Sequence, residues 1–252
     1  MAKPLTYFAS DVHLGLQVGD PVQRERNFVR FLKEIDPART QALYLLGDIF
    51  DFWYEYRYVV PKGSARVLGA ITDLIDAGVE VYFFQGNHDL WTFHYFEELG
   101  MVKLQQPYVA EIGGKRFCMG HGDGLGPGNH WYKFVKGIFS QRWAQVLFST
   151  LHPWIAFHWA TGWSHRSRTE KPIAYTFRGA DEPLYKFCRD FLSATPVEHF
   201  IFGHYHCLAD IPLPGTAPAS SSAPTLHLLG DWFSAPNWLV YDAATAQLRR
   251  QP

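Results

Sequence analysis

The chain has 252 residues and is 47% hydrophobic, which is enough for the core of one large α/β domain or of a domain with an insertion. Its formal net charge is −1, so no global field attracts nucleic acid or an anionic membrane, and only a local basic patch could do so. The three cysteines have neither disulfide-framework nor metal-knuckle spacing, which predicts reduced thiols and a cytosolic protein.

The N-terminal residues run directly into a predicted strand and show no signal-peptide or transit-peptide character. No segment of the sequence reaches the roughly 18 uninterrupted apolar residues of a membrane-spanning helix. We therefore expect a cytoplasmic protein, or one bound peripherally at the cytosolic surface of a membrane.

In the first part of the chain, short apolar runs alternate with amphipathic segments. Aliphatic and aromatic residues predict buried strands at Leu5–Ala9, Ala42–Leu46 and Val79–Phe84. Apolar residues at three-to-four spacing predict helices between them, at Val22–Ile35 and Ser64–Ala77. This β-α-β-α-β order predicts a layered α/β fold.

A predicted strand at Lys115–Met119 precedes a segment of different character, residues 124–180. Apolar and aromatic residues from Trp131 to Ile155 follow helical spacing there, and we expect Pro153 to end or kink the helix. The segment holds seven Lys or Arg residues and one acidic residue, Glu170. We therefore predict an aromatic and basic helical lid at about 124–180, inserted into a single domain that spans residues 1–252.

Beyond this lid the chain returns to α/β character, with one helix followed by strands. The helix is expected at Asp181–Ser193, and Ala209–Thr225 reads as an exposed loop because it holds four prolines and a run of serines. The remaining strands are predicted at His199–Phe202, Thr225–Leu229 and Trp238–Tyr241.

Five short polar motifs each follow a predicted strand. Ligands gather at the carboxyl ends of strands in α/β sheets, so these motifs are expected to converge on one site. Any one of them alone is weak evidence, but five in a set order are hard to reach by chance. They are Asp11-x-His13, Gly47-Asp48-x-x-Asp51, Gly86-Asn87-His88-Asp89, Gly120-His121-Gly122-Asp123 and Gly203-His204-x-His206.

The motifs supply nitrogen and oxygen ligands without a thiolate. That set suits Mn²⁺, Fe, Zn²⁺ or Co²⁺ and disfavours a site for Mg²⁺ alone. We expect two divalent ions bridged by the Asp48 carboxylate. One ion is expected on Asp11, His13, Asp48 and His206, and the other on Asp48, Asn87, His121 and His204.

Such a centre indicates hydrolysis of a phosphoester or anhydride bond. Two cations lower the pKa of a shared water, so that a metal-bound hydroxide attacks a phosphorus whose charge the same cations neutralise. His88 is then free to hold phosphate oxygens or to protonate a leaving group, with Asp89 orienting it. Asn87 is expected to contact the substrate as well as the metal. Asp51 and Asp123 are expected to contact the metal ligands and to orient them without binding the metal.

At these motifs the chain resembles the calcineurin-like metallophosphoesterase superfamily, over roughly residues 5–206. The resemblance implies a four-layer α/β/β/α sandwich with the helical lid inserted. A closer resemblance, to the UDP-2,3-diacylglucosamine pyrophosphatases of the lipid A pathway, rests on Leu45–Phe50, Gly120–Asp123, the aromatic and basic insertion and Leu229–Trp232.

This closer resemblance implies the substrate, the metal and the location. The substrate is a nucleotide-linked glycolipid, UDP-2,3-diacylglucosamine, whose pyrophosphate is cleaved to a lipid monophosphate and UMP. Mn²⁺ is the implied activator. The lid implies a cavity for acyl chains and contact with the inner membrane. The resemblance implies no obligate protein partner.

Two features depart from the family pattern. His88 stands where the best-known members have an arginine, and an arginine holds phosphate with a fixed charge and a bidentate fork. In the lid, Ser164, Arg168 and Lys171 are the nearest match to the family's sugar-phosphate contacts, with Arg168 replacing an asparagine.

Two alternative functions stay open on the sequence. The first is another metallophosphoesterase, acting on a soluble nucleotide, a phosphoprotein or nucleic acid. His88 favours it, whereas the aromatic insertion and the low net charge argue against a polar or nucleic-acid substrate. The second is a catalytically inert scaffold that binds a membrane or a partner. The aromatic residues of the lid either pack on a core or line an acyl-chain groove.

Overall fold

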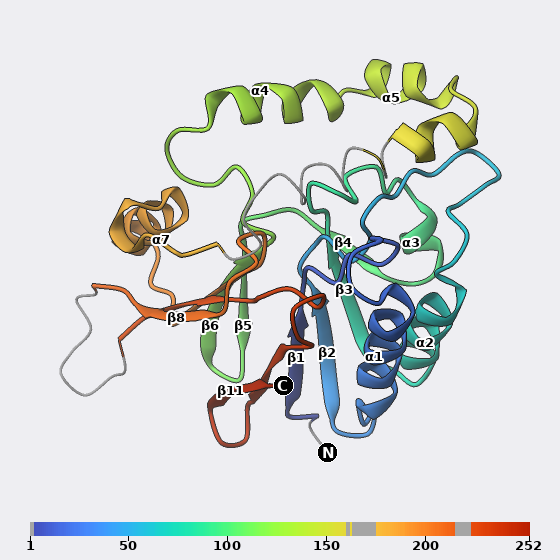
Figure 1. Ribbon diagram of the computed structural model, residues 1–252. Helices are drawn as coiled ribbons and strands as arrows, with labels where there is room; N and C mark the ends of the chain where they lie inside the picture. The colour runs from blue at the N-terminus through green and yellow to red at the C-terminus, as the bar shows by residue number, and fades with distance from the viewer. Residues whose placement is uncertain (1–2, 160–161, 163–174, 215–222) are drawn as a thin grey trace.

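The computed structural model describes residues 3–159, 162, 175–214 and 223–252, and in it two β-sheets pack face to face between outer helices (Figure 1). This is the predicted four-layer arrangement. The six-stranded sheet has the order β11-β10-β1-β2-β3-β4, and the five-stranded sheet has the order β5-β6-β7-β9-β8. In both sheets a parallel centre is flanked by antiparallel strands at one edge or at both.

The strands of the first sheet are β1 (Leu5–Ala9), β2 (Thr40–Leu45), β3 (Glu80–Phe84), β4 (Val102–Leu104), β10 (Trp238–Asp242) and β11 (Gln247–Gln251). Those of the second sheet are β5 (Tyr108–Ile112), β6 (Lys115–Gly120), β7 (His199–Phe202), β8 (Ala209–Pro212) and β9 (Thr225–Leu228). The helices are α1 (Pro21–Glu34), α2 (Ala65–Asp76), α3 (Tyr95–Glu98), α4 (His130–Phe139), α5 (Arg142–Ser149), a 3₁₀ turn (Gly179–Asp181) and α7 (Pro183–Ala194).

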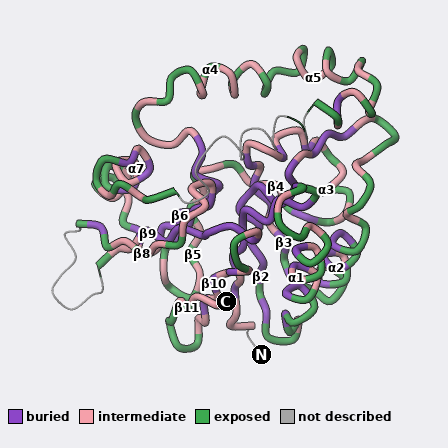
Figure 2. The backbone as a smooth tube through the Cα atoms, viewed as in Figure 1, coloured by how far each residue is buried: buried purple, intermediate pink, exposed green. Residues whose placement is uncertain are grey.

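Alternation along the strands divides the core into layers. Successive side chains of a strand point to opposite faces, so Phe8 of β1 enters the space between the sheets while Tyr7 packs toward α1. Between the sheets Phe8 stacks on Tyr44 and Phe117, with ring centroids 5.4 and 5.7 Å apart. Figure 2 shows the buried chain concentrated in these central layers.

The predicted strands and the three core helices occur within two residues of their expected bounds. The loop predicted at Ala209–Thr225 is partly wrong, because β8 pairs antiparallel with β9 despite the prolines nearby. Pro212 ends that edge strand, where its missing N–H removes no central ladder bond.

The single helix predicted across Trp131–Ile155 is also wrong. It is broken between α4 and α5, and residues 153–159 form a further helical stretch. Pro153 begins this stretch instead of ending a helix, and proline is well tolerated there because the first helical N–H has no partner in any case.

The helices α4 and α5 arch over the carboxyl ends of the strands (Figure 1). Neither helix contains a buried residue. Side chains from the loops after β2 and β3 bind the backbone of these helices: Trp91 Nε1 donates to the Phe139 carbonyl at 2.9 Å, and Tyr54 Oη donates to the Gln145 carbonyl at 2.7 Å. In the part of the chain that the structure describes, no helix is long and apolar enough to cross a membrane.

Candidate metal centre

The five polar motifs lie together at the carboxyl ends of β1, β2 and β3 from one sheet and of β6 and β7 from the other. The site therefore sits where the two sheets meet, below the arch formed by α4 and α5 (Figure 1). The sequence-predicted ligands come from these five strand ends: Asp11 and His13, Asp48, Asn87, His121, and His204 and His206.

Asp11, His13, Asp48 and His206 form one compact cluster, with one ligand atom from each lying within 4.8 Å of all the others. His13 Nε2 lies 3.2 Å from His206 Nε2 and 3.7 Å from a carboxylate oxygen of both Asp11 and Asp48. His206 Nε2 lies 3.1 Å from Asp11 Oδ1. Two imidazole nitrogens and two carboxylates gathered at one point are a donor set that suits a divalent cation.

A second group of ligand atoms adjoins the first through Asp48. The Leu46 carbonyl can only accept, so His121 Nδ1, 3.0 Å away, must carry a proton and donate it. In a neutral His121 the other nitrogen, Nε2, then has no proton and can only accept. The atoms that it faces, Asp48 Oδ2 at 3.3 Å and Asn87 Oδ1 at 3.2 Å, are acceptors too. Asn87 Oδ1 also lies 2.9 Å from His204 Nδ1. Converging acceptors of this kind fit a bound cation.

The electrostatics of the second group show that it favours positive charge. Burial opposes a charge on His121, but the nearby carboxylates, chiefly that of Asp48, raise the pKa of His121 to about 10. Burial together with the charge of His121 lowers the pKa of His204 to about 4. Burial works against ionisation of Asp48, yet the surrounding histidines hold its pKa well below the usual range. A buried anionic centre of this kind attracts positive charge.

The backbone is unusual at the same residues. Among described residues other than glycine, seven have positive φ, and five of the seven are expected metal ligands: Asp11, His13, Asp48, His204 and His206. Such conformations cost roughly 1–3 kcal/mol each and cluster at functional sites. Close packing accompanies them, because a β-carbon on Gly86 or Gly203 would collide with the carboxylate of Asp48 or Asp11 respectively.

Asp89 and His88 occupy different positions although they are neighbours in sequence. The Asp89 carboxylate is fully buried and accepts from the backbone N–H groups of Gly86 and of residues 48–50. These contacts fix the loop that carries Asp48. The His88 ring is 23% exposed, and its Nδ1 lies 2.9 Å from the Asp51 carbonyl and 3.5 Å from Asp51 Oδ1. Asp51 Oδ1 also lies 3.4 Å from His13 Nδ1, so one carboxylate contacts both histidines.

Asp123 connects the centre to the first lid helix. Its carboxylate accepts from Tyr132 Oη at 2.5 Å and from Lys136 Nζ, both on α4, and from Gln106 Nε2 at 2.8 Å. Burial works against its ionisation, but His121 and Lys136 lower the pKa of Asp123. The lid is thereby tied to the loop that carries His121.

Some site residues were not found from the sequence. Arg24 is buried and donates from Nη1 to the His13 carbonyl at 2.8 Å and to the Leu16 carbonyl at 3.1 Å, which steadies the loop after β1. The available signal was an arginine four residues before Phe28 on the apolar face of α1. Three predicted substrate contacts, Ser164, Arg168 and Lys171, lie outside the described residues.

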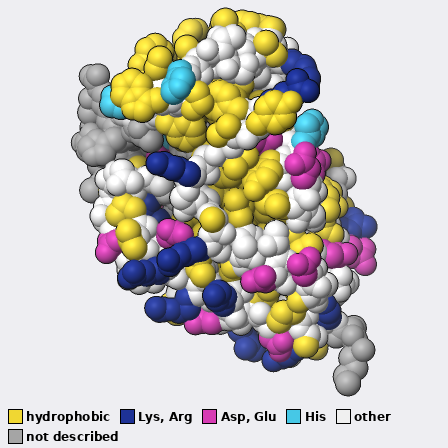
Figure 3. All heavy atoms as spheres, turned by 90° about the vertical axis from the view of Figure 1, so that its right-hand side faces the viewer, with side chains coloured by type: hydrophobic (Ala, Val, Ile, Leu, Met, Phe, Trp, Pro, Cys, Tyr) yellow, Lys and Arg dark blue, Asp and Glu magenta, His cyan; other side chains and the backbone are white. Residues whose placement is uncertain are grey.

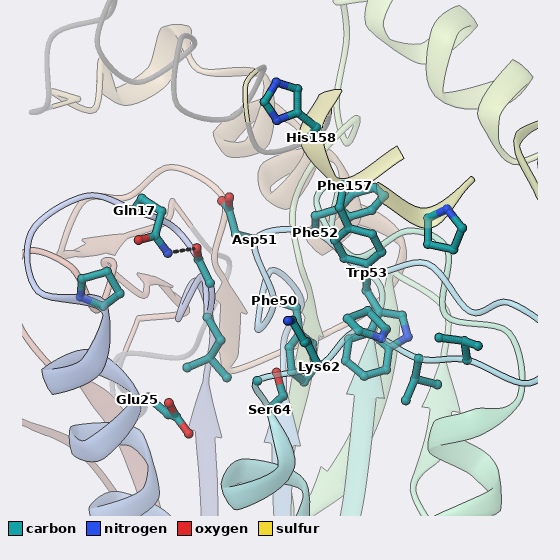
Figure 4. A pocket seen from close by; sticks show the side chains of 18 of the residues that line it. Gln17, Glu25, Phe50, Asp51, Phe52, Trp53, Lys62, Ser64, Phe157 and His158 are labelled. Carbon is teal, nitrogen blue, oxygen red and sulfur yellow. Dashed lines mark hydrogen bonds between the residues drawn. The ribbon is translucent and has the colours of Figure 1, made fainter. Parts of the chain in front are cut away.

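A cavity of about 710 Å³ lies beneath residues 153–158, beside the centre. Figure 4 shows Phe52 and Phe157 next to each other in its lining, with Asp51 nearby. The two rings lie 5.0 Å apart in an edge-on arrangement. Because Asp51 lines the cavity and also contacts His13 and His88, the cavity reaches the rim of the metal centre. Its walls are largely apolar, with Leu14, Val22, Phe50, Trp53, Val60 and Trp154 among them, and the charged residues Glu25 and Lys62 also line it.

Comparison with known proteins identifies a matching family and several similar proteins. The model of the family described as calcineurin-like phosphoesterase matches residues 5–208. A protein of Porphyromonas gingivalis named UDP-2,3-diacylglucosamine hydrolase is 36% identical over 96% of this chain and 95% of its own. A protein of the same name from Stenotrophomonas maltophilia is 32% identical, covering 94% and 95% of the two chains. The solved structure of a dimetal phosphatase from Danio rerio is 13% identical, with 99% of each chain covered and a TM-score of 0.46.

Proposed function

Since this chain belongs to the calcineurin-like phosphoesterase family and is a metal-dependent hydrolase of phosphoester or anhydride bonds, we propose that its substrate is UDP-2,3-diacylglucosamine. The reaction would cleave the pyrophosphate to a lipid monophosphate and UMP. The observation that carries this proposal is the apolar cavity that begins at Asp51 and runs beneath the lid. The names of the full-length relatives support it.

We propose that two divalent ions, with Mn²⁺ as the activator, bind to the seven predicted ligands. Asp11, His13, Asp48 and His206 would hold one ion, and Asp48, Asn87, His121 and His204 the other. When bound, such a pair supplies a water of lowered pKa and neutralises charge at phosphorus. The protein's own part is to direct these side chains inward. The hydrogen bonds from the Asp48 loop and Gly86 to the Asp89 carboxylate contribute to that.

His88 is the proposed group for the leaving phosphate. Its ring is 23% exposed and its Nδ1 contacts Asp51 at the rim of the centre, so we place the ring where it can meet the substrate. From there it can donate a hydrogen bond to a phosphate oxygen or a proton to the leaving oxygen, a contribution of typically 10²–10⁴-fold for a positioned general acid. Asn87 would contact the substrate from the same loop.

The cavity fits an acyl chain better than a polar group. Phe52, Trp53 and Phe157 line it, and burying an apolar chain against such walls gains roughly 0.8 kcal/mol per methylene. A soluble nucleotide or a phosphoprotein would gain less from these apolar walls than an acyl chain does. This is our reason for preferring a lipid substrate even though His88 replaces the family's arginine.

We also propose that the lid contacts the inner membrane from the cytosolic side. Trp131, Trp143 and Leu147 on its outer surface are 76%, 63% and 64% exposed. Figure 3 shows hydrophobic side chains gathered at the top of the molecule, where the lid lies. Aromatic and aliphatic residues on an interfacial helix enter the boundary between headgroups and acyl chains. A protein placed there would meet a lipid substrate directly.

The test is release of UMP from detergent-dispersed UDP-2,3-diacylglucosamine by Mn²⁺-loaded protein. We expect turnover with the native chain and none with Asp48→Asn, which should lack bound metal. Protein that carries its metals, leaves this substrate intact and hydrolyses a generic aryl phosphate diester would contradict the proposed substrate. That outcome would favour the alternative of a phosphoesterase for another substrate, to which His88 also points.

A further inference from the structure

A second groove lies on the flank of the lid, apart from the metal centre. It has a volume of about 1070 Å³ and is bounded by the loop of residues 54–60, by residues 92–95 and by α5. Among the described residues, none of the expected metal ligands lines it. Val59 and Val60 line both this groove and the apolar cavity, so the two spaces share one wall.

The helix α5 presents a different surface on each of three sides. Arg142, Gln145, Val146 and Ser149 line the groove, and their spacing of three or four residues places them on one side of the helix. On a second side Phe148 packs on Trp91 and Tyr54, with ring centroids 4.4 and 4.9 Å apart.

The third side of α5 is apolar and open to solvent. Trp143 and Leu147 are 63% and 64% exposed, and they lie roughly 100° around the helix from the groove-lining positions that precede them. Val146, 58% exposed, lies between the two sides and lines the groove as well. The groove therefore opens at the edge of the apolar outer surface of the lid.

Two arginines at this groove are available to a ligand. Arg57 and Arg142 are both exposed, and within the part of the chain that the structure describes neither forms an ion pair, although Arg57 lies over the neighbouring Tyr58 ring at 5.2 Å from its centroid. The buried Glu55 is already engaged, since it accepts from Trp53 Nε1 and from the N–H groups of residues 94 and 95. Of the other charged groups, Lys103 donates to the Phe93 carbonyl and to Glu97, His94 lies 3.6 Å from Glu97, and Glu98 is exposed.

We propose that this groove binds the phosphate headgroup of an anionic phospholipid while the adjoining apolar surface enters the bilayer. Arginine suits this ligand because its planar fork binds phosphate oxygens in pairs. A lipid whose tails run beside Trp143 and Leu147 would bring its phosphate to the level of Arg142, at the N-terminal end of α5. This inference rests on the proposed function, in which the lid contacts the membrane. It names the class of lipid that binds the lid at the membrane surface.

The experiment is sedimentation of the full chain with phosphatidylcholine vesicles that either contain or lack phosphatidylglycerol. The variant is Arg57→Gln with Arg142→Gln. Its matched control is Arg39→Gln with Arg116→Gln, which removes the same charge from exposed residues at the opposite end of the strands. A third variant, Ser149→Trp, fills the groove without changing the charge.

A basic residue near an anionic membrane contributes roughly fivefold to binding, so the double variant should bind phosphatidylglycerol vesicles about 25-fold more weakly. The control should bind like the native chain. The Ser149→Trp variant should lose the preference for phosphatidylglycerol and keep its binding to phosphatidylcholine. Thermal melting of each variant establishes that it is folded.

Three results would overturn the proposal. The double variant and its control could bind phosphatidylglycerol vesicles equally well, or the double variant could lose as much binding to phosphatidylcholine vesicles as to phosphatidylglycerol vesicles. The third is a Ser149→Trp variant that binds phosphatidylglycerol vesicles like the native chain. Hydrolysis of detergent-dispersed substrate is measured in parallel and should not change in any variant. Absence of that hydrolysis in the native chain would refute the proposed substrate while leaving the vesicle comparison to decide on the groove.

Discussion

The Asp89 carboxylate joins two loops of the metal centre, and replacing it by the isosteric amide should separate them. Oδ1 accepts from the N–H groups of Asp48 at 3.2 Å and Gly86 at 2.8 Å, and Oδ2 accepts from those of Ile49 at 2.8 Å and Phe50 at 3.3 Å. Asparagine has one oxygen and one NH₂ group. In either orientation, Asp89→Asn therefore turns a donor toward two buried N–H groups.

The expected magnitude follows from that count. A buried donor left without an acceptor costs about 1–3 kcal/mol, so two of them should lower the free energy of unfolding by about 2–6 kcal/mol. That is a large part of the roughly 5–15 kcal/mol that stabilises a typical domain. Because the Asp89 carboxylate holds the Asp48 loop in place, the metal content should fall together with the stability.

The assay is urea unfolding combined with elemental analysis of bound metal. Burial and the charge of Asp48 raise the pKa of Asp89 to about 7, so the measurement is made well above that pH, where the native side chain is ionised. Asp76→Asn, an exposed change on α2, is the control and should alter stability by no more than about 0.5 kcal/mol. An Asp89→Asn protein with native stability and a full complement of metal would refute this reasoning.

Four further predictions concern the site and the fold. His88→Ala should lower kcat by roughly 10²–10⁴-fold with both metals retained, and unchanged turnover would remove its proposed role. Phe157→Ala should raise KM for the diacylated substrate roughly tenfold to a hundredfold, judged from the burial of one aromatic side chain, and should spare a short-chain analogue. Gly203→Ala forces Asp11 to move, so metal affinity measured by chelator competition should fall about 10–100-fold, and native affinity would contradict the close packing. Burial and His227 lower the pKa of His199 to about 4, below its usual 6.5, so its neutral form contributes stability that declines as pH falls from about 6.5 toward 4. His199→Gln should therefore flatten the pH dependence of the urea midpoint in that window, and a profile parallel to the native one would count against this.

The sequence predicted the elements whose own residues form a recognisable apolar pattern. The strands β1 and β7 begin and end where their apolar runs do, because each is buried between layers. Edge strands carry no such signal. β11, with the sequence QLRRQ, was missed since it pairs with one neighbour, has one apolar residue and leaves Gln247 and Arg249 exposed.

The break between α4 and α5 was not predictable from periodicity. The helical spacing of apolar residues continues from one side of residues 140 and 141 to the other, although the chain turns there. Contacts from distant residues accompany the turn, such as the hydrogen bond from Trp91 Nε1 to the Phe139 carbonyl at the end of α4. Such a contact depends on the tertiary fold, which a local pattern does not contain.

At the metal centre, sequence motifs indicated the ligand residues but not their support. The four N–H groups that Asp89 accepts come from two loops about 40 residues apart. The spacing of Gly86, Asn87, His88 and Asp89 suggested that Asp89 orients the neighbouring histidine. In the folded chain its carboxylate accepts from backbone N–H groups of Gly86 and of the Asp48 loop, and it is Asp51 that contacts His88 Nδ1. Only the three-dimensional arrangement makes this visible.

The left-handed backbone at five expected ligands limits how this centre can be altered by mutation or by evolution. Aspartate, asparagine and histidine tolerate that conformation better than other residues with a β-carbon, whereas β-branched residues do not. Asp48→Asn can therefore remove a charge while the loop keeps its path, but Asp48→Val would change ligand and loop together. Divergent copies of this chain that gave up metal binding would keep their fold most readily by exchanging residues within that small set or by introducing glycine.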